Sequence, residues 1–396
     1  MATKTKEQEL FDLIDIEDFK DRVVCGYNDG SAELGLAADL SVARSIIAPG
    51  TAALRDFSYI GPDAPVLDNA NCVGCMECVT ECPDTAILGK VVPADEYERR
   101  LAAFDTDAER EQFAGHFNRT RKFYDAVEKK GGKPGMFGIF IDPTKCKGCA
   151  ECVEVCGEHN ALHMEVKDDR GLEWFKTGWR HFLELPDTPA EYINERVLTD
   201  MMLSSEALST FTGGAGSCMG CGEVSALRMM LAATAFVHGK DNIGLVAATG
   251  CNTVYASTYP YNPYTVPWMN SLFENAATTA AGVRLRWDQM GWGEKKIWTL
   301  GGDGGMIDIG FQALSRLLAS GMDVNVMILD TQVYSNTGGQ TSTASFFGQE
   351  AKLSAHGKAR GGKVERRKEA GQIAMVHPAG YVAPTTAAHP NHLHPA

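Results

Sequence analysis

The stretch that decides the fold is Leu300-Gly301-Gly302-Asp303-Gly304-Gly305-Met306, and a second informative stretch, residues 330–339, reads DTQVYSNTGG. Residues 296–300 predict a short strand, and apolar residues at helical spacing predict a helix over 307–320. Gly321 stands where a left-handed helix stop is expected. Residues 324–329 are apolar apart from one asparagine, as in a parallel strand covered on both faces. This order of elements predicts a βαβ unit in an α/β fold with a doubly wound parallel sheet.

The two stretches also carry a candidate binding site. The glycines of the first would let the backbone approach phosphate oxygens, and a following helix N-terminus favours negative charge. Asp303 supplies a carboxylate after the first strand, and Thr331 and Val333 supply a hydroxyl and a carbonyl after the second. Because Mg²⁺ favours such oxygen ligands, we expect a diphosphate and Mg²⁺ here. A tight turn with an incidental aspartate is the alternative, and the second polar stretch makes it less favoured.

Length and charge limit the classes of protein to which the chain can belong. A chain of 396 residues suggests two or three domains, and its net charge of −14 argues against nucleic acid or an anionic membrane as a partner. Neither an apolar run of spanning length nor a signal peptide is present in the sequence, so we expect a cytoplasmic protein. Twelve cysteines in such a chain indicate metal or cluster ligation instead of disulfides.

Eight of these cysteines repeat one spacing. Cys72, Cys75, Cys78 and Cys82 form C-x2-C-x2-C-x3-C before a proline, and Cys146, Cys149, Cys152 and Cys156 form the same pattern before a glycine. This is the bacterial ferredoxin pattern, in which the fourth cysteine of each run binds the cluster of the other run. We therefore expect two [4Fe-4S] clusters, one on Cys72, Cys75, Cys78 and Cys156 and one on Cys146, Cys149, Cys152 and Cys82. Zinc is the alternative, but zinc sites usually pair two separated CxxC units without a third internal cysteine.

Three further cysteines suggest a third site. Cys218 and Cys221 form a CxxC pair, and Cys251 follows in a Thr-Gly-Cys sequence after a predicted buried strand over 243–248. A helix is expected over 224–237, ending at Gly239. Spacing alone leaves two interpretations open, a cluster that lacks one ligand or three unrelated thiols.

Residues 329–340, LDTQVYSNTGGQ, are very similar to the pyruvate:ferredoxin oxidoreductases, and the chain resembles the carboxyl-terminal part of that family. Residues 268–276, WMNSLFENA, also resemble it, although 277–279 depart from its pattern. The resemblance implies thiamine diphosphate, Mg²⁺ and three [4Fe-4S] clusters as cofactors. It implies that Cys218, Cys221 and Cys251 bind the cluster nearest to thiamine, whose fourth cysteine has no match after Cys251.

The resemblance also assigns roles to single residues. Asn336 is expected near the substrate, and Glu223 near thiamine, although Glu223 can equally be a carboxylate that favours a helix N-terminus. The residues expected to bind thiamine diphosphate and its cation are Glu223, Cys251, Gly302, Asp303, Gly304, Gly305, Thr331, Gln332, Val333, Tyr334, Ser335 and Asn336.

The implied activity is oxidative decarboxylation of pyruvate to acetyl-CoA and CO2, or its reverse, with electrons passed through the clusters to ferredoxin or flavodoxin. Other 2-oxo acids (2-oxoglutarate, oxalate or branched-chain acids) and a purely electron-transferring polyferredoxin-like subunit are the alternatives. A non-oxidative thiamine decarboxylase would have no use for eight cluster cysteines. The family's pyrimidine-binding and coenzyme A-binding domains have no match here, so we expect a hetero-oligomer with subunits that carry them.

These observations divide the chain into three expected segments. Residues 1–60 have no assigned role and contain an expected helix near 8–22 and the lone Cys25. Residues 61–165 form a small α+β domain with two [4Fe-4S] clusters and a helical insert at 93–136, after a boundary loop at 59–65. Residues 166–396 form the diphosphate-side thiamine domain, which we expect to be incomplete at its carboxyl-terminal end.

Overall fold

The structure is a computed structural model that describes residues 16–35, 45–354, 361–378 and 380–393. The chain forms two compact units. The parallel-sheet unit comprises Met1–Arg55, Gly214–Gly216 and Asn242–Val382, and the cysteine-rich unit comprises Asp56–Gly213, Ser217–Asp241 and Ala383–Ala396. The segments expected from the sequence are contiguous, whereas these units interleave along the chain, so the expected domain limits stay predictions.

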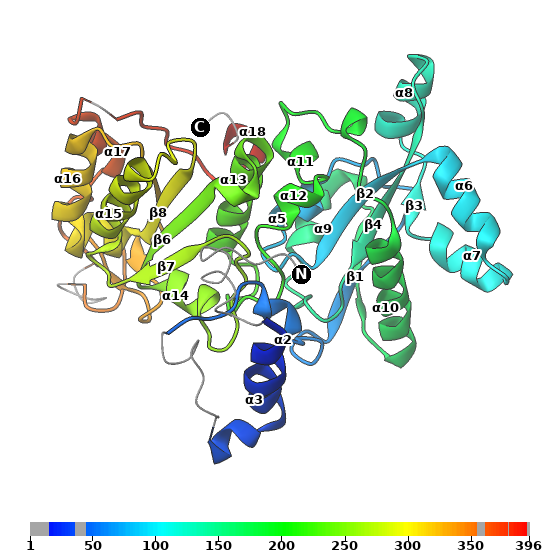
Figure 1. The fold of residues 1–396 in the computed structure, drawn as a ribbon, viewed down its shortest axis with the longest axis horizontal. Helices are drawn as coiled ribbons and strands as arrows, with labels where there is room; N and C mark the ends of the chain where they lie inside the picture. The colour runs from blue at the N-terminus through cyan, green and yellow to red at the C-terminus, as the bar shows by residue number, and fades with distance from the viewer. Residues whose placement is uncertain (1–15, 36–44, 355–360, 379, 394–396) are drawn as a thin grey trace, which may run out of the picture. The chain divides into compact units, whose positions relative to one another are not determined.

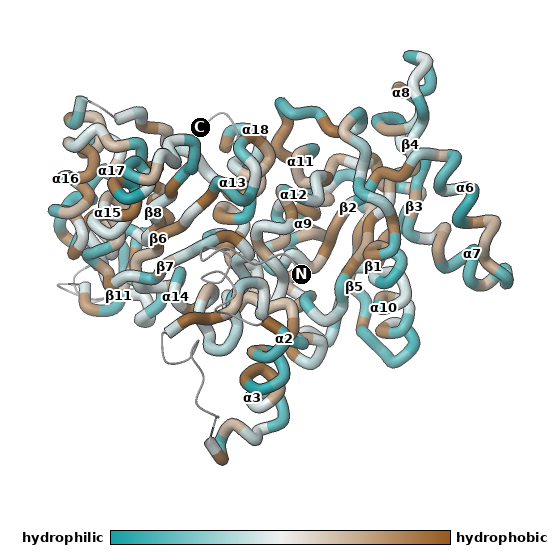
Figure 2. Tube along the Cα trace, viewed as in Figure 1, coloured by the Kyte–Doolittle hydropathy of each residue, from teal (hydrophilic) through white to brown (hydrophobic). Residues whose placement is uncertain are grey.

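The parallel-sheet unit is built on a four-stranded sheet in the order β7-β6-β8-β9, in which all neighbours run parallel (Figure 1). Its strands are β6 (Ile243–Ala248), β7 (Trp268–Ser271), β8 (Lys296–Gly302) and β9 (Asn325–Leu329). Every residue of β6 is buried, and Figure 2 shows apolar colour along β6 and β8. The sheet confirms the predicted α/β class, and β6 occupies the residues that the sequence predicted.

Helices pack on this sheet through small and apolar side chains. Helix α15 (Ala276–Gln289) lies against β6, β8 and α16 (Phe311–Ser320), and Ala276, Ala280 and Leu314 belong to its core. Helix α16 ends at Gly321, whose φ of 68° is the left-handed conformation expected there. The predicted helix at 307–320 is instead divided into the π-turn η8 (Gly304–Ile309) and α16, because Gly310 donates its N–H to the carbonyl of Gly305.

Strand β9 differs from the prediction of a strand covered on both faces. It pairs only with β8 in the described sheet, and of its residues only Leu329 is buried. An apolar run therefore identified the strand correctly but not its position at an edge, since periodicity does not report how many neighbours a strand has.

Around the sheet lie several short elements. The described helical residues at the amino-terminal side run from Ile16 to Asp29 and stop at Gly30, whereas the predicted helix near 8–22 lies partly outside the described residues. Residues 333–341 form a tight hairpin. The remaining elements are α2 (Ile16–Phe19), η1 (Lys20–Val24), α3 (Cys25–Asp29), η2 (Ser31–Leu34), η3 (Thr51–Leu54), α14 (Cys251–Ala256), β10 (Val333–Tyr334), β11 (Gln340–Thr341) and α17 (Ala370–Met375).

The cysteine-rich unit has an internal two-fold repeat. Strand β1 (Asp63–Leu67) pairs antiparallel with β5 (Leu162–Val166), and each cysteine motif leads into a short helix, α5 (Glu77–Glu81) or α9 (Glu151–Cys156). The predicted boundary loop at 59–65 is therefore wrong at its end, because Pro65 lies within β1. A two-stranded ribbon tolerates proline, since each strand has a free edge.

A second sheet, in the order β2-β4-β3, carries the insert. Its strands are β2 (Ile87–Pro93), β3 (Phe117–Asn118) and β4 (Gly135–Ile141). The insert at 93–136 contains helices as predicted, but it is not helical throughout, because Phe117 lies in β3 and packs with Tyr97 and Phe113. Its helices are α6 (Ala94–Ala103), α7 (Asp107–Ala114), η4 (Arg121–Asp125) and α8 (Ala126–Lys129), and α10 (Asp169–Glu184) lies against α7.

Helix α13 (Gly222–His238) completes the cysteine-rich unit and packs against α5. It ends at Gly239, where the sequence predicted the helix stop. The other elements of this unit are η5 (Gly157–His159), η6 (Ala190–Tyr192), α11 (Leu198–Met201), α12 (Ser205–Leu208), η7 (Lys240–Asn242) and α18 (Pro390–Leu393). In the part of the chain that the structure describes, no helix combines the length and the apolar character needed to cross a bilayer.

Candidate functional site

The two cysteine motifs adopt the same backbone path. Gly74 and Gly148 have φ values of 75° and 73°, and Met76 and Ala150, each two residues later, have φ values of 70° and 65°. Side chains other than glycine seldom adopt this conformation, so its repetition at two non-glycine positions indicates a backbone shaped for a purpose. In each motif the N–H of the glycine donates a hydrogen bond to the sulfur of the first cysteine, Cys72 or Cys146.

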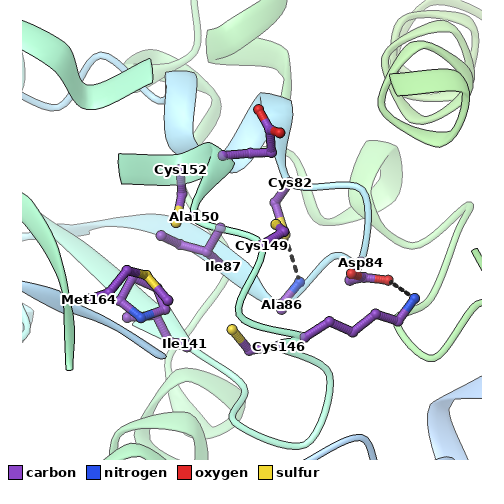
Figure 3. A pocket seen from close by; sticks show the side chains of 13 residues that line it. Cys82, Asp84, Ala86, Ile87, Ile141, Cys146, Cys149, Ala150, Cys152 and Met164 are labelled. Atoms are coloured by element: carbon purple, nitrogen blue, oxygen red, sulfur yellow. Dashed lines mark hydrogen bonds and ion pairs between the residues drawn. The ribbon is translucent and has the colours of Figure 1, made fainter. Parts of the chain in front are cut away.

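The eight cysteines divide into two sets of four. Site 1 is a cavity of about 350 Å³, part of it open to solvent, and its cysteines are Cys72, Cys75, Cys78 and Cys156. Site 2 is a similar cavity of about 370 Å³ (Figure 3), and its cysteines are Cys146, Cys149, Cys152 and Cys82. Each cavity thus takes three cysteines from one motif and the fourth from the other, the division that the ferredoxin spacing predicts.

Backbone N–H groups point at these sulfur atoms. The amide of Ala86 donates to Sγ of Cys82 at 3.4 Å, and the amide of Ala161 donates to Sγ of Cys156 at 3.3 Å. Donors of this kind stabilise negative charge on a ligand sulfur. The two fourth cysteines therefore accept matching backbone hydrogen bonds.

Burial works against free thiolates at both sites. It raises the pKa of the Cys72 thiol to about 11 and that of Cys146 to about 12. Such thiols stay protonated at neutral pH unless a metal supplies positive charge, which deprotonates a coordinating thiol. Four thiols around one small cavity therefore suit a metal centre and have no evident purpose without one.

A single zinc ion fits this arrangement poorly. Zinc–sulfur bonds of about 2.3 Å would hold tetrahedral ligands roughly 3.8 Å apart. Among the described residues, no three cysteine, histidine, aspartate or glutamate side chains are grouped as one ion would require. Thiolates spread around a cavity instead suit a group with several metal atoms.

The candidate cation site lies in the parallel-sheet unit, after β8 and β9. Asp303 directly follows β8 and is only 1% exposed. The Thr331 hydroxyl lies 3.4 Å from Oδ1 of Asp303 and 3.0 Å from the carbonyl of Val333. Mg²⁺ binds oxygens at 2.0–2.1 Å, so neighbouring octahedral ligands are about 2.9 Å apart. Both distances from the Thr331 hydroxyl are thus close to the spacing of neighbouring magnesium ligands.

Surrounding groups hold this arrangement in place. Ser342 donates its hydroxyl to Oδ2 of Asp303, and Ser335 shares a 2.7 Å hydrogen bond with the Thr331 hydroxyl. Burial raises the pKa of Asp303, and the nearby negative charge of Asp330 adds to the effect. A divalent cation would relieve both, because it stabilises the charged carboxylate.

The backbone between the proposed ligands is strained. Gln332, between Thr331 and Val333, has a φ of 63° and is held by a hydrogen bond from its N–H to Oδ1 of Asp330 at 3.1 Å. Gly304 has no room for a side chain, since a Cβ there would lie 2.4 Å from the Tyr334 ring. Strain and close packing of this kind gather at functional sites.

The other predicted residues are placed as follows. Gly302 is the last residue of β8, Gly305 lies in η8, and Asn336 is exposed in the hairpin. Cys251 begins α14 directly after β6, so it follows the strand next to the one before Asp303. Glu223 lies in the first turn of α13, which fits the helix-terminus interpretation as well as the thiamine one.

The third set of cysteines is divided between the two units. Cys251 belongs to the parallel-sheet unit, whereas Cys218 and Cys221 belong to the cysteine-rich unit. Cys218 is exposed and Cys221 precedes α13. The third cluster therefore stays a prediction from the sequence.

Sequence reasoning missed several residues of these sites. Ser342 contacts Asp303 from far along the chain. Lys363 is 4% exposed and donates to the carbonyls of Ser342, Thr343 and Ser345 at 2.9–3.0 Å, which fixes that turn. Asp308 accepts the Tyr334 hydroxyl at 2.7 Å and could have been noticed as a second acid in the glycine-rich stretch.

Comparisons with known proteins agree with this arrangement. The family model "4Fe-4S dicluster domain" matches residues 64–157, and "Thiamine pyrophosphate enzyme, C-terminal TPP binding domain" matches residues 248–392. The dicluster match thus spans both cysteine motifs, and the thiamine match spans both cation loops.

Curated relatives extend the match to most of the chain. Pyruvate-flavodoxin oxidoreductase of Rhodospirillum rubrum is 28% identical over 79% of this chain and 30% of its own length. Pyruvate:ferredoxin oxidoreductase of Moorella thermoacetica is 27% identical over 82% of this chain and 32% of its own length. Pyruvate synthase subunit PorB of Pyrococcus horikoshii is 38% identical over 45% of this chain and 55% of its own length. The chain thus spans about a third of the first two relatives.

A solved structure of 2-oxoglutarate:ferredoxin oxidoreductase from Magnetococcus marinus is 21% identical over 45% of this chain and 56% of its own, with a TM-score of 0.36 that is too low to support a statement about fold. The matched domains and the named relatives confirm the predicted resemblance. The chain combines a 4Fe-4S dicluster domain with a thiamine pyrophosphate-binding domain, and over most of its length it is similar to pyruvate-flavodoxin and pyruvate:ferredoxin oxidoreductases.

Proposed function

We propose that this chain is the electron-transferring and diphosphate-binding part of a 2-oxoacid:ferredoxin oxidoreductase. The proposed reaction is oxidative decarboxylation of pyruvate to acetyl-CoA and CO2, or the reverse synthesis of pyruvate. The observation that carries the proposal is the presence, in one chain, of two four-cysteine cavities and of a buried Asp303 beside Thr331 and Val333.

The chain's own residues define the role of the diphosphate site. Asp303, Thr331 and Val333 would hold Mg²⁺, and the backbone at Gly304 and Gly305 would lie against the diphosphate. Ser342 and Lys363 keep the cation ligands in position. Bound thiamine diphosphate supplies a carbon nucleophile for the 2-oxo carbon and a place for the electron pair that CO2 leaves behind.

The loop before α13 supports the proposed third cluster. The Gly220 N–H donates a hydrogen bond to the Cys149 thiol of site 2. Lys147, from the same motif, donates to the Ser217 carbonyl at 2.9 Å and to its hydroxyl at 3.2 Å. These hydrogen bonds hold the loop that carries the Cys218–Cys221 pair next to site 2. We propose that Cys218, Cys221 and Cys251 bind a third [4Fe-4S] cluster, and that electrons pass from it through sites 2 and 1 to ferredoxin or flavodoxin.

The proposed partners carry the domains of the family that this sequence does not match. Subunits with the pyrimidine-binding and coenzyme A-binding domains would complete the active site, in which Glu223 and Asn336 act near thiamine and substrate. Pyruvate is favoured as the substrate because the named relatives are pyruvate enzymes.

The first experiment measures cofactor content. We expect anaerobically purified chain to contain iron and acid-labile sulfide in equal amounts, to absorb visible light, and to bind thiamine diphosphate only with Mg²⁺. Pyruvate should bleach the visible absorbance after the partner subunits are added, and not before. Colourless protein, or zinc in place of iron, would refute the proposal. Full iron content without any binding of thiamine diphosphate would indicate the pure electron carrier instead.

A further inference from the structure

The repeat in the cysteine-rich unit makes the two sites nearly equivalent. Each has the same bend before its helix, and each fourth cysteine accepts a backbone N–H a few residues further on. A difference in electrostatic environment between the sites must therefore come from residues outside the repeat. Arg228 of α13 is such a residue.

Arg228 lies against the end of α5, and its side chain is only 3% exposed. Its Nη1 donates to the carbonyls of Val79 at 3.2 Å and Thr80 at 3.5 Å, and also to the carbonyl of Cys82, a ligand of site 2. These acceptors are the unpaired carbonyls at a helix C-terminus, where a cation is favourable. Cys78, the site 1 cysteine on the same helix, lies a full turn earlier.

The charge of Arg228 lacks a contacting carboxylate. Within the described part of the chain Arg228 forms no salt bridge, and the partners of its guanidinium are backbone carbonyls. A buried cation is strongly unfavourable unless negative charge lies nearby. A [4Fe-4S] cluster with four thiolate ligands carries net negative charge and would provide it at Cys82.

Other charges at site 2 do not cancel this effect. Lys147 and Asp84 form a buried ion pair of 2.7 Å, seen in Figure 3, which is close to neutral as a pair. Lys167 donates to the Cys146 carbonyl at 3.5 Å, and the exposed Glu151 contributes a carboxylate to the lining of site 2. The carboxylates of Glu81 and Asp84 also act on Arg228. Neither forms an ion pair with it among the described residues, so Arg228 remains the buried cation in contact with the Cys82 carbonyl.

The described lining of site 1 includes no comparable cation. Its lining is apolar apart from the cysteines and the exposed His159, and includes Met76, Phe137 and Ile139. At the end of α9, the helix that corresponds to α5, the chain turns at Gly157. No described arginine or lysine donates to the Cys156 carbonyl there. The cation at the end of α5 therefore has no described counterpart at the end of α9.

We propose that Arg228 sets the order of reduction in the dicluster domain, because its buried charge at Cys82 makes the cluster of site 2 the more easily reduced of the two. This inference rests on the proposed function, since it requires both sites to hold clusters. A cluster's reduction potential depends on charge and hydrogen bonding around it. A single electron from an external reductant would therefore reside on site 2, next to the Ser217–Cys221 loop, before it moves to site 1.

The experiment uses the full chain, prepared anaerobically with Cys218→Ser and Cys221→Ser so that only sites 1 and 2 titrate. Dithionite titration followed by electron paramagnetic resonance should give two midpoint potentials. Arg228→Gln keeps donors for the carbonyls but removes the charge, and should lower the higher midpoint only. We expect the equilibrium constant for transfer of one electron between the two clusters to change at least about tenfold, which corresponds to about 59 mV. Arg228→Lys should keep both midpoints near their original values.

Two further variants make the result decisive. Arg284→Gln replaces an equally buried arginine in the parallel-sheet unit, where it donates to the carbonyls of Lys295 and Trp292, and should move neither midpoint. Glu151→Gln removes an exposed negative charge at site 2 and should raise the higher midpoint.

Unchanged midpoints in Arg228→Gln with full iron content, or equal shifts of both, would overturn the inference. If Arg228→Gln loses its iron, the Glu151→Gln variant decides alone. A rise of only the lower midpoint in Glu151→Gln would show that site 2 is the harder site to reduce, and would overturn the inference. Absence of iron and sulfide in the unsubstituted chain would refute the proposed function itself.

Discussion

His116 should make the cysteine-rich unit less stable in mild acid. Its ring is 5% exposed, stacks on Phe140 with centroids 5.1 Å apart, and lies 5.3 Å from the Trp174 ring. Burial lowers the pKa of His116 to about 4 from 6.5, and the nearby His181 adds to the shift. The folded protein therefore holds this imidazole neutral over a range in which the unfolded chain would protonate it.

The size of the effect follows from proton linkage. As the pH falls below 6.5 the unfolded chain gains a proton at His116 that the folded chain refuses until about pH 4. The free energy of unfolding therefore decreases through that window. The two pKa values give a loss of about 2 kcal/mol at pH 5 and about 3 kcal/mol once the pH is below 4, as order-of-magnitude figures.

Urea unfolding followed by tryptophan fluorescence, at pH 7.5 and pH 5.0, measures this loss. His116→Phe keeps an aromatic ring but cannot be protonated, so about 2 kcal/mol of the pH dependence should disappear. The control His163→Gln changes an exposed histidine and should leave the pH dependence as it was. Equal pH dependence in His116→Phe and the original chain would refute the reasoning.

Three further predictions concern the binding sites. Asp303→Ala should reduce Mg²⁺-dependent binding of thiamine diphosphate, measured by calorimetry, at least about 100-fold, while Asp323→Asn, an exposed carboxylate paired only with a lysine, should not; equal affinities would place the cation elsewhere. Ser342→Ala removes one hydrogen bond to the Asp303 carboxylate and should weaken the same binding about tenfold, and no change would mean that this hydroxyl does not position the ligand. Cys82→Ala and Cys156→Ala should each remove half of the dicluster iron by elemental analysis, and should affect different electron paramagnetic resonance signals; loss of the same signal in both would contradict the exchange of fourth cysteines.

Local spacing predicted the parts of the fold that depend on neighbours in sequence. The stops at Gly239 and Gly321 follow from the need for a left-handed residue after a helix. Strand β6 was predictable because it is buried throughout and so is a continuous apolar run. The division of eight cysteines into two sets follows from their repeated intervals, which place each fourth cysteine about one helical turn after the third.

Contacts between distant segments were not predictable in the same way. Ser342, Lys363 and Arg228 reach their partners through tertiary packing, and serine, lysine and arginine are too common on surfaces for one sequence to single out buried examples. Strand β1 was missed because Pro65 suggests a loop, and only its partner β5 shows that this edge accepts a proline. Whether a strand lies at the edge of a sheet, as β9 does, depends on neighbouring strands that its own sequence does not identify.

Helix α13 has a consequence for how the dicluster domain can be isolated. Ser225 donates to the Glu81 carbonyl at 2.7 Å, Arg228 binds the end of α5, and Ala232 belongs to the same apolar core as Val79. A fragment cut to the length of a free bacterial ferredoxin would leave these carbonyls and this core uncovered. The dicluster domain is thus packed against a helix encoded well downstream of its cysteines. Any excised version must therefore include residues 217–241.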